Sequence, residues 1–383
     1  MSMLAPYEQK QSRKVLVAVI DGKSEHREQV NAALTSFYRV VLFDDCDAAY
    51  STLIRFPPAT LLVDESAQPA GGVKTIQRLR AAPQLANVPI VFTTKQVRVF
   101  PQHELDQMGA NAVLQKPFRR SQLLKLISSL VNSSVEAKWE TLPEHQKQCL
   151  QKTVDMFNGI SDLIDKGEPI SYRTMVMACD PLVEVVRQHD VKSLMASVRD
   201  HDNYSYVHSL RVATLLSMFG HAIGLEGDEL TVLASGGLVH DIGKMTIPHE
   251  VLNKPGRLDD AELVVMRSHV DRTLEHLRRS PNLPPGISTI ASQHHEKLDG
   301  SGYPKGLQAG QLNELARMAS IVDVFSALTD RRVYKPPMPP EDALAIMTGE
   351  MGPHLDQRLL GQFREMLLSA IPDEATLRAV RQG

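Results

Sequence analysis

Histidines and aspartates that could bind metal ions lie in separate segments of the second half of the chain. They are His208, His240-Asp241, His269, His294-His295 and Asp323. Neutral imidazole and carboxylate groups are ligands for divalent metals such as Fe, Mn, Zn, Ni and Co. A lone histidine on a helix is more often structural or exposed, so the argument rests on the ordered set. We interpret this set as a candidate metal centre.

The residues around these ligands form longer motifs. The run Val239-His240-Asp241-Ile242-Gly243-Lys244 resembles the signature of the HD superfamily of metal-dependent phosphohydrolases. The run from His294 to Pro304 resembles the longer signature of its HD-GYP subfamily, and the residues from Val322 to Lys335 resemble that subfamily's downstream motif. The resemblance covers roughly residues 195–365 and implies an all-helical bundle around a buried metal cluster.

The resemblance also implies an activity and a ligand set. The subfamily hydrolyses cyclic di-GMP to the linear dinucleotide pGpG or to GMP, and some members act on cyclic GMP-AMP. The first implied metal ion is held by His208, His240, Asp241 and Asp323. The second is held by His269, His294, His295 and Asp241, whose carboxylate can bridge two ions where an imidazole cannot.

The chemistry explains why such residues are needed. A phosphodiester is anionic and resists attack by neutral water, whereas two close metal ions lower the pKa of a water and stabilise charge on phosphoryl oxygens. Lys244 lies three residues after Asp241, on the same face if the helix continues, and could contact a phosphate oxygen. We assign catalysis to Asp241 and Lys244. The resemblance assigns substrate phosphate to Lys244, Arg332 and Lys335, which suits guanidinium and ammonium groups.

A loop of turn residues follows the ligand pair His294-His295. It contains Gly302, Tyr303 and Pro304. This loop is expected to shape the pocket or to bind partner proteins, because the resemblance links such loops to diguanylate cyclase (GGDEF) domains.

One departure from the subfamily's pattern limits the number of metal ions that we expect. Some subfamily members have a glutamate four residues before the first ligand histidine, which permits a third ion. Here that position is Tyr204, and a neutral phenol is a poor ligand for hard divalent metals. We therefore predict a binuclear centre. A second aspartate of the downstream motif is replaced by Ser326, to which we assign no role.

The first part of the chain alternates short apolar runs with amphipathic stretches. Residues 14–20, 60–63 and 88–92 are predicted to be buried strands, and helical patterns such as 25–36 and 74–81 lie between them. This alternation favours a doubly wound α/β domain with a parallel five-stranded sheet, over residues 14–132.

Polar residues follow the ends of those strands. They are Asp21, Asp64, Thr94 and Lys116. Because ligands bind at the carboxyl ends of parallel strands, this pattern resembles the response-regulator receiver domain. The resemblance makes Asp64 a phosphoryl acceptor assisted by Mg²⁺, a hydroxyl and a lysine, supplied with phosphate by a sensor histidine kinase. Receivers have two adjacent acidic residues after the first strand, and Gly22 stands in the second place, so a domain that only docks or dimerises is the other reading.

The rest of the chain is predicted to be helical. Residues 133–194 are read as a linker and connecting helices, and residues 195–365 as the phosphohydrolase domain. Helical periodicity covers 144–166, 172–189, 207–223, 228–240 and 355–371. The stretch 144–189 could pair across a homodimer.

Bulk composition sets further limits. The 383 residues suit two domains, and a net charge of −3 gives no reason to expect a nucleic-acid partner. The three cysteines are far apart, the first residues lack an apolar signal core, and no apolar run is long enough to span a membrane. A cytoplasmic protein is expected.

The leading hypothesis is a cyclic dinucleotide phosphodiesterase regulated by a receiver-like domain. Two other readings are a low-turnover module that senses cyclic di-GMP or pGpG, and a general nucleotide phosphohydrolase, which the Gly302-Tyr303-Pro304 segment disfavours.

Overall fold

The structure is a computed structural model. In it the chain forms two compact units, Met1–Glu136 and Ala137–Gly383. It describes residues 15–35, 37–198, 204–252, 254, 256–330 and 338–370. Each unit has its own buried core and is considered by itself.

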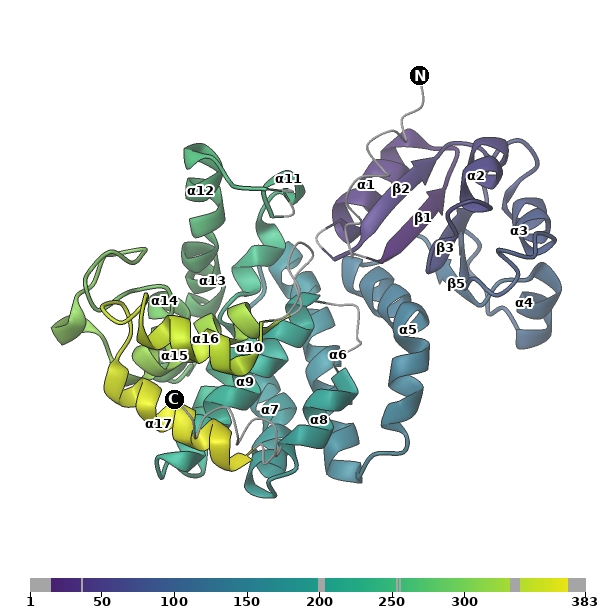
Figure 1. The fold of residues 1–383 in the computed structure, drawn as a ribbon. Coiled ribbons are helices and arrows are strands. Elements are labelled where there is room, and N and C mark those ends of the chain that lie inside the picture. The colour runs from purple at the N-terminus through teal and green to yellow at the C-terminus, as the bar shows by residue number, and fades with distance from the viewer. Residues whose placement is uncertain are drawn as a thin grey trace. The chain divides into compact units, whose positions relative to one another are not determined.

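The first unit is a parallel α/β domain, as the sequence predicts (Figure 1). Its strands are β1 (Leu16–Ile20), β2 (Arg39–Phe43), β3 (Thr60–Asp64), β4 (Ile90–Thr94) and β5 (Ala112–Gln115). They pair in parallel in the order β2-β1-β3-β4-β5. The helices are α1 (Ser24–Leu34), α2 (Cys46–Leu53), α3 (Gly72–Arg80), α4 (Gln102–Met108) and α5 (Arg120–Trp139), whose last residues belong to the second unit.

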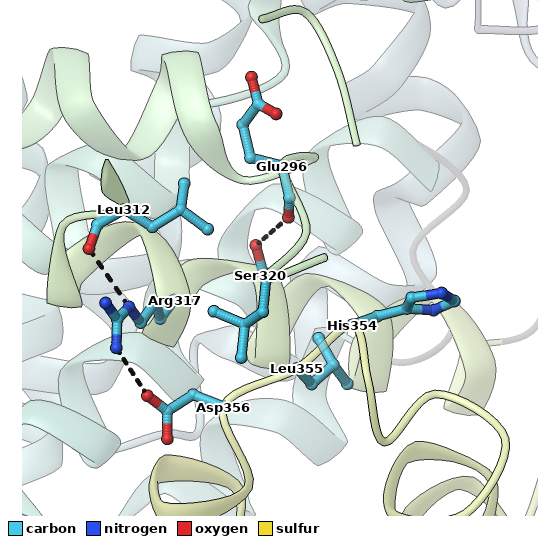
Figure 2. Close-up of a pocket in the computed structure, with 8 residues that line it drawn as sticks. Glu296, Leu312, Arg317, Ser320, His354, Leu355 and Asp356 are labelled. Carbon is cyan, nitrogen blue, oxygen red and sulfur yellow. Dashed lines mark hydrogen bonds and ion pairs between the residues drawn. The ribbon is translucent and has the colours of Figure 1, made fainter. Parts of the chain in front are cut away.

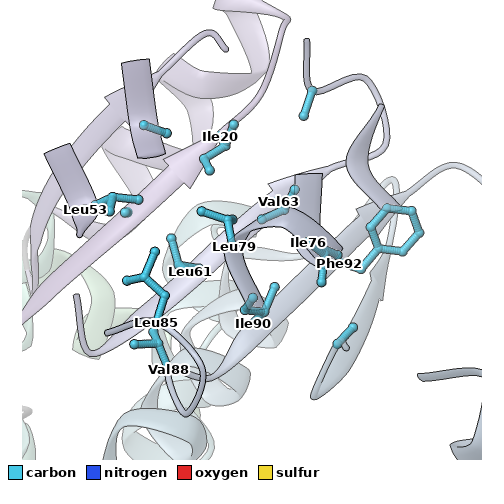
Figure 3. Close-up of a cluster of buried hydrophobic side chains, with 14 of the residues drawn as sticks. Ile20, Leu53, Leu61, Val63, Ile76, Leu79, Leu85, Val88, Ile90 and Phe92 are labelled. Carbon is cyan, nitrogen blue, oxygen red and sulfur yellow. The ribbon is translucent and has the colours of Figure 1, made fainter. Parts of the chain in front are cut away.

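Both faces of this sheet are buried, which explains its continuous apolar strands. Alternate residues such as Ile20, Leu61 and Val63 join a cluster with side chains of α2, α3 and α4 (Figure 3). The residues between them, including Val19 and Leu62, are also buried. Because all strands run the same way, Asp21 directly after β1 and Asp64 at the end of the neighbouring β3 lie at the same edge of the sheet.

The predicted strand 88–92 lies two residues later in the structure. Proline at position 89 has no N–H to donate to a ladder, and the Val88 N–H donates to the Leu85 carbonyl in a turn instead. The paired strand therefore begins at Ile90.

The second unit is helical, and the residues described in it form no strand. It begins with α6 (Glu144–Lys166), α7 (Tyr172–Arg187), α8 (Val191–Val198), α9 (Tyr204–Ala222), α10 (Asp228–Val239), the 3₁₀ turn η1 (Ile242–Thr246) and α11 (His249–Leu252). It continues with α12 (Asp260–Arg267), α13 (His269–Arg278), α14 (Pro285–Gln293), the 3₁₀ turn η2 (Ala309–Gln311), α15 (Glu314–Thr329), α16 (Pro340–Thr348) and α17 (Gln357–Ala370). Figure 1 shows α9, α10, α13, α14 and α15 gathered in one bundle.

Candidate metal centre

Five elements of this bundle bring the predicted ligands together. His208 comes from α9, Asp323 from α15, and His269 begins α13, while His240-Asp241 and His294-His295 directly follow α10 and α14. The side chains form two groups, and within each group the ligand atoms lie within 4.8 Å of one another. One group is Asp241, His269, His294 and His295, and the other is His208, His240 and Asp323.

Asp241 lies between the two groups. Its Oδ2 is 3.3 Å from His240 Nε2 and 3.9 Å from His208 Nε2. Its Oδ1 is 3.2 Å from His269 Nε2 and 3.7 Å from His294 Nε2. Each carboxylate oxygen therefore faces a different group, which is the arrangement that a bridging ligand requires.

Asp323 also faces both groups. Its Oδ1 is 3.1 Å from His208 Nε2, and its Oδ2 is 3.8 Å from His295 Nδ1. The sequence prediction assigns Asp323 to one ion only. The geometry gives it a second neighbour, because α15 passes beside the residues that end α14.

Backbone carbonyls orient three of the imidazoles. His240 Nδ1 lies 2.7 Å from the Gly237 carbonyl, His269 Nδ1 lies 2.7 Å from that of Met266, and His294 Nδ1 lies 3.0 Å from that of Ala291. These carbonyls belong to the last turns of α10, α12 and α14, where a helix leaves its carbonyls without an intrahelical partner. A proton on Nδ1 donates to each carbonyl, which leaves Nε2 as the nitrogen that faces the centre.

Four of the buried atoms that face inward have no hydrogen-bond partner. They are Nε2 of His240, His269 and His294, and Oδ1 of Asp241. A buried polar atom without a partner costs about 1–3 kcal/mol, so such a concentration calls for a ligand. The imidazole and carboxylate set fits divalent transition-metal ions in both groups.

Negative charge dominates the electrostatics of the centre. Burial disfavours charge on His240, but the carboxylates of Asp241 and Asp323 outweigh it and raise its pKa to about 10. Burial and the neighbouring His294 hold the pKa of His295 well below its usual range. Despite burial, the pKa values of Asp241 and Asp323 lie well below normal, because Lys244 and the surrounding histidines favour the carboxylates. The carboxylates stay charged and attract cations.

Asp330 is a buried residue of this centre that the sequence analysis did not select. Its Oδ2 is 3.2 Å from His208 Nδ1, and its other oxygen accepts from Arg211. His208 is thus held between Asp330 and Asp323. Position 330 carries no local signal of this role, because the contact joins residues that are far apart in the chain.

Lys244 contacts Asp241, although the helix does not continue as expected. α10 ends at Val239, and Lys244 lies in η1. In a 3₁₀ turn the side chains at positions i and i+3 eclipse, so the Lys244 ammonium still pairs with Asp241 Oδ2. The Lys244 side chain is 31% exposed and can therefore meet a ligand that enters the centre.

The Gly302-Tyr303-Pro304 loop lies against the second ligand group. The Tyr303 ring stacks on His295 with centroids 4.7 Å apart, and the Arg267 guanidinium lies 5.0 Å from the Tyr303 centroid. A Cβ on Gly302 would lie 2.5 Å from the Glu296 Cα, so only glycine allows this close approach.

A buried glutamate holds this loop in place. Glu296 Oε1 accepts from the Lys305 N–H at 2.7 Å, and Oε2 accepts from the Leu307 N–H at 2.9 Å. A small pocket lies behind it (Figure 2). There, the Ser320 hydroxyl donates to the Glu296 backbone carbonyl, and Arg317 donates to Leu312 and Asp356.

Some predicted residues cannot be placed. Arg332 and Lys335 lie outside the described residues. Tyr204 begins α9, but its side chain is not among those described, so the predicted limit of two ions rests on sequence.

The first unit brings Asp21, Asp64 and Lys116 together at the edge of the sheet. Lys116 Nζ pairs with Asp64 Oδ2 and lies 4.0 Å from Asp21 Oδ2. Burial opposes charge on Asp64, but hydrogen bonds from Lys116, Ser66 and Thr93 outweigh it and lower the Asp64 pKa.

Thr94 does not join this group. Its hydroxyl donates to Glu65 Oε2 at 2.5 Å, whereas the Thr93 hydroxyl donates to Asp64 at 2.7 Å. Thr93 is paired with Asp64 in the register of β3 and β4, which turns its side chain to the buried carboxylate. In this structure the hydroxyl that contacts Asp64 is therefore that of Thr93, in place of the predicted Thr94 hydroxyl.

No helix among the described residues is both long and apolar enough to cross a membrane.

Two family models match the chain. The HD domain matches residues 192–359, and the response regulator receiver domain matches residues 17–128.

Three curated relatives illustrate what the chain is similar to. A probable cyclic di-GMP phosphodiesterase of Vibrio cholerae is 27% identical, over 91% of this chain and 76% of the relative. The cyclic di-GMP phosphodiesterase response regulator RpfG of Xanthomonas campestris is 27% identical, over 78% of this chain and 72% of the relative. The 3'3'-cGAMP-specific phosphodiesterase 1 of Vibrio cholerae is 37% identical, over 42% of this chain and 37% of the relative.

Proposed function

The chain joins a response regulator receiver domain to an HD domain, and on this premise we propose that it is a metal-dependent phosphodiesterase that hydrolyses cyclic di-GMP to pGpG or GMP. The observation that carries the proposal is the placement of Asp241 between two groups of ligand residues, in which the inward Nε2 atoms of His240, His269 and His294 lack hydrogen-bond partners.

The proposed ligand sets follow the two groups. His208, His240 and Asp323 would hold one ion, His269, His294 and His295 the other, and Asp241 would contact both. Fe, Mn, Ni, Zn and Co all suit these donors. When bound, the ions would supply a water of lowered pKa and Lewis acidity at the phosphoryl oxygens.

The chain's own residues perform the remaining tasks. Lys244 holds Asp241 in its charged form and offers an ammonium to a phosphate oxygen. Asp241 and Lys244 are the proposed catalytic residues. We propose that Arg332 and Lys335 bind substrate phosphate, which rests on their chemistry and on the motif that contains them.

The loop of Gly302, Tyr303 and Pro304 forms one wall of the proposed substrate site. Its tyrosine covers His295, and its proposed second role is to contact GGDEF proteins.

An activity assay with a matched control tests this function. The full chain is purified with Fe²⁺ or Mn²⁺ under reducing conditions and supplied with cyclic di-GMP, pGpG or cyclic GMP-AMP. Asp241→Ala should abolish turnover and metal loading. Asp271→Ala, which removes an exposed carboxylate from the helix that begins at His269, should change neither.

The other outcomes of this assay are equally clear. Faster hydrolysis of cyclic GMP-AMP would replace the proposed substrate with the one named for the third relative. Binding of cyclic di-GMP without product under any metal would make the chain a sensing module.

We propose that the first unit receives a phosphoryl group at Asp64 from a sensor histidine kinase, with a divalent cation in attendance. The Asp64 oxygen would form the new bond to phosphorus as the bond to the donor's imidazole breaks. Radiolabel transfer to the full chain that is lost in Asp64→Asn would support this. Equal labelling of both would refute it. A homodimer through α6 and α7 is the proposed assembly, which sedimentation of the full chain tests.

A further inference from the structure

The cluster of Asp21, Asp64 and Lys116 at the edge of the sheet includes an imidazole that receiver chemistry does not require. His26, in the first turn of α1, directs Nδ1 to Asp21 Oδ2. Asp21, His26 and Asp64 each offer one ligand atom, and these atoms lie within 4.8 Å of one another. The cluster therefore combines nitrogen and oxygen donors.

Two buried carboxylates concentrate negative charge in this cluster. The side chains of Asp21 and Asp64 are 1% and 2% exposed, and the Ser66 hydroxyl lies 3.2 Å and 2.6 Å from their respective Oδ1 atoms. Lys116 is a permanent cation that reaches both carboxylates, and His26 pairs with Asp21. Buried carboxylates are stabilised by bound cations, so a divalent ion beside His26 would add to the charge that Lys116 supplies.

Mg²⁺ fits this cluster poorly. It needs near-octahedral oxygen ligands, and Gly22 supplies no carboxylate after Asp21. The packing leaves no room for one, because a Cβ at Gly22 would lie 2.7 Å from the Ser66 carbonyl oxygen. His26 instead brings a nitrogen donor close to the two carboxylates.

Neighbouring side chains hold the His26 imidazole beside the buried carboxylates. The His26 ring meets the Phe118 ring edge to face, with centroids 5.7 Å apart and planes at 73°. Its Nδ1 also lies 3.5 Å from Lys116 Nζ, next to the buried carboxylates. The side chain is 17% exposed, so an ion can enter from solvent on this side.

We propose that Asp21, His26 and Asp64 form a second metal site, which binds a borderline divalent ion such as Zn²⁺, Co²⁺ or Mn²⁺ in preference to Mg²⁺. Imidazole favours such ions, whereas Mg²⁺ favours oxygen alone. The metal that attends this receiver-like unit is then a transition metal.

Metal counting on the full chain tests the proposal. Wild type, His26→Ala and His103→Ala are dialysed against Zn²⁺ with a millimolar excess of Mg²⁺, and bound zinc is measured by mass spectrometry. His103 is an exposed histidine of the same unit and serves as the matched control. Wild type and His103→Ala should hold one more zinc per chain than His26→Ala. Asp21→Asn should also lose that ion.

The number of zinc ions bound per chain distinguishes this site from the helical centre. All these variants keep the ligands of α9, α10, α13, α14 and α15, so the difference reports the first unit alone, whatever the turnover. His26→Gln provides a second variant if His26→Ala fails to give the circular dichroism of the wild type. Equal zinc in wild type and a folded His26 variant overturns the proposal. Loss of the additional ion to Mg²⁺ in the wild type also overturns it.

Discussion

At the scale of single residues, Asp330 determines how His208 meets the metal centre. The Asp330 carboxylate holds the Nδ1 side of the ring at 3.2 Å, and Asp323 faces the Nε2 side at 3.1 Å. Burial raises the Asp330 pKa, but His208 and Arg211 lower it by more. The Asp330 carboxylate therefore stays charged. A carboxylate behind a ligand histidine fixes its tautomer and increases its basicity.

Asp330→Asn should weaken metal binding while leaving the fold intact. The amide is similar in size but loses the charge that favours a proton on His208 Nδ1. Loss of such an outer contact lowers metal affinity or activity by about 10–100-fold. Titration of the metal-free chain with Mn²⁺ measures this. Asp271→Asn, on an exposed carboxylate, is the control, and equal affinity in both variants would contradict the role of Asp330.

At the scale of elements, η1 packs directly on α13. A Cβ at Gly243 would lie 2.1 Å from the His269 backbone oxygen and 2.8 Å from the Thr273 N. His269 is a predicted metal ligand. Because Gly243 has no side chain, η1 can approach α13 closely, and this approach sets the distance between His269 and Asp241.

Gly243→Ala should destabilise the helical unit by about 1–3 kcal/mol or more, because overpacking forces the backbone to move. It should also reduce metal loading, since His269 moves with α13. Gly159→Ala is the matched change: it lies within α6, where a Cβ meets nothing within 4 Å. Helix propensity predicts that this change stabilises by up to about 1 kcal/mol. Chemical denaturation measures both, and similar effects would contradict the packing argument.

The loop after α14 depends on the two hydrogen bonds that Glu296 accepts. Glu296→Gln would place an amide N–H₂ against the N–H of either Lys305 or Leu307. A buried donor left without an acceptor costs about 1–3 kcal/mol. We expect faster hydrogen exchange at Lys305 and Leu307 and a lower kcat. Glu275→Gln, at an exposed ion pair with Arg279, should do neither. Unchanged exchange in Glu296→Gln would show that the carboxylate does not hold the loop.

Sequence predicted the elements well where periodicity was strong. The helix expected over 144–166 has those bounds, and the five-stranded parallel sheet is confirmed. The 3₁₀ turn after Asp241 was not predicted, because the pattern of the preceding helix carries no signal for a change of helix type. Motifs likewise selected the candidate ligands that the structure brings together. The contact of Asp330 with His208 joins segments that are far apart in the chain, and the contacts of Glu296 and His26 depend on how a loop and the first turn of α1 fold.

At the scale of the whole molecule, each unit has its own core and its own cluster of side chains that could bind a metal ion. The metal-free helical centre leaves buried nitrogen and oxygen atoms without partners and brings ligands from separate helices into one place. A metal ion would satisfy those atoms and link the helices. Metal binding should therefore stabilise the native helical unit against unfolding.

The single tryptophan allows this unit to be followed alone. Trp139 belongs to the second unit, is 2% exposed, and donates to the Ser197 carbonyl at 3.1 Å. Its fluorescence should change when the helical unit unfolds, because the indole then enters water. The first unit contains no tryptophan.

Thermal unfolding followed by Trp139 fluorescence should shift upward with Mn²⁺ and return with a chelator. An ion at about 100 times its dissociation constant stabilises the native state by about 2.7 kcal/mol. Asp241→Ala removes the ligand that faces both groups, so Mn²⁺ should no longer raise its transition. Asp271→Ala and His26→Ala keep every helical ligand and should retain the full shift. An equal shift in Asp241→Ala would mean that the stabilising ion binds elsewhere, and the ligand assignment would fail with it.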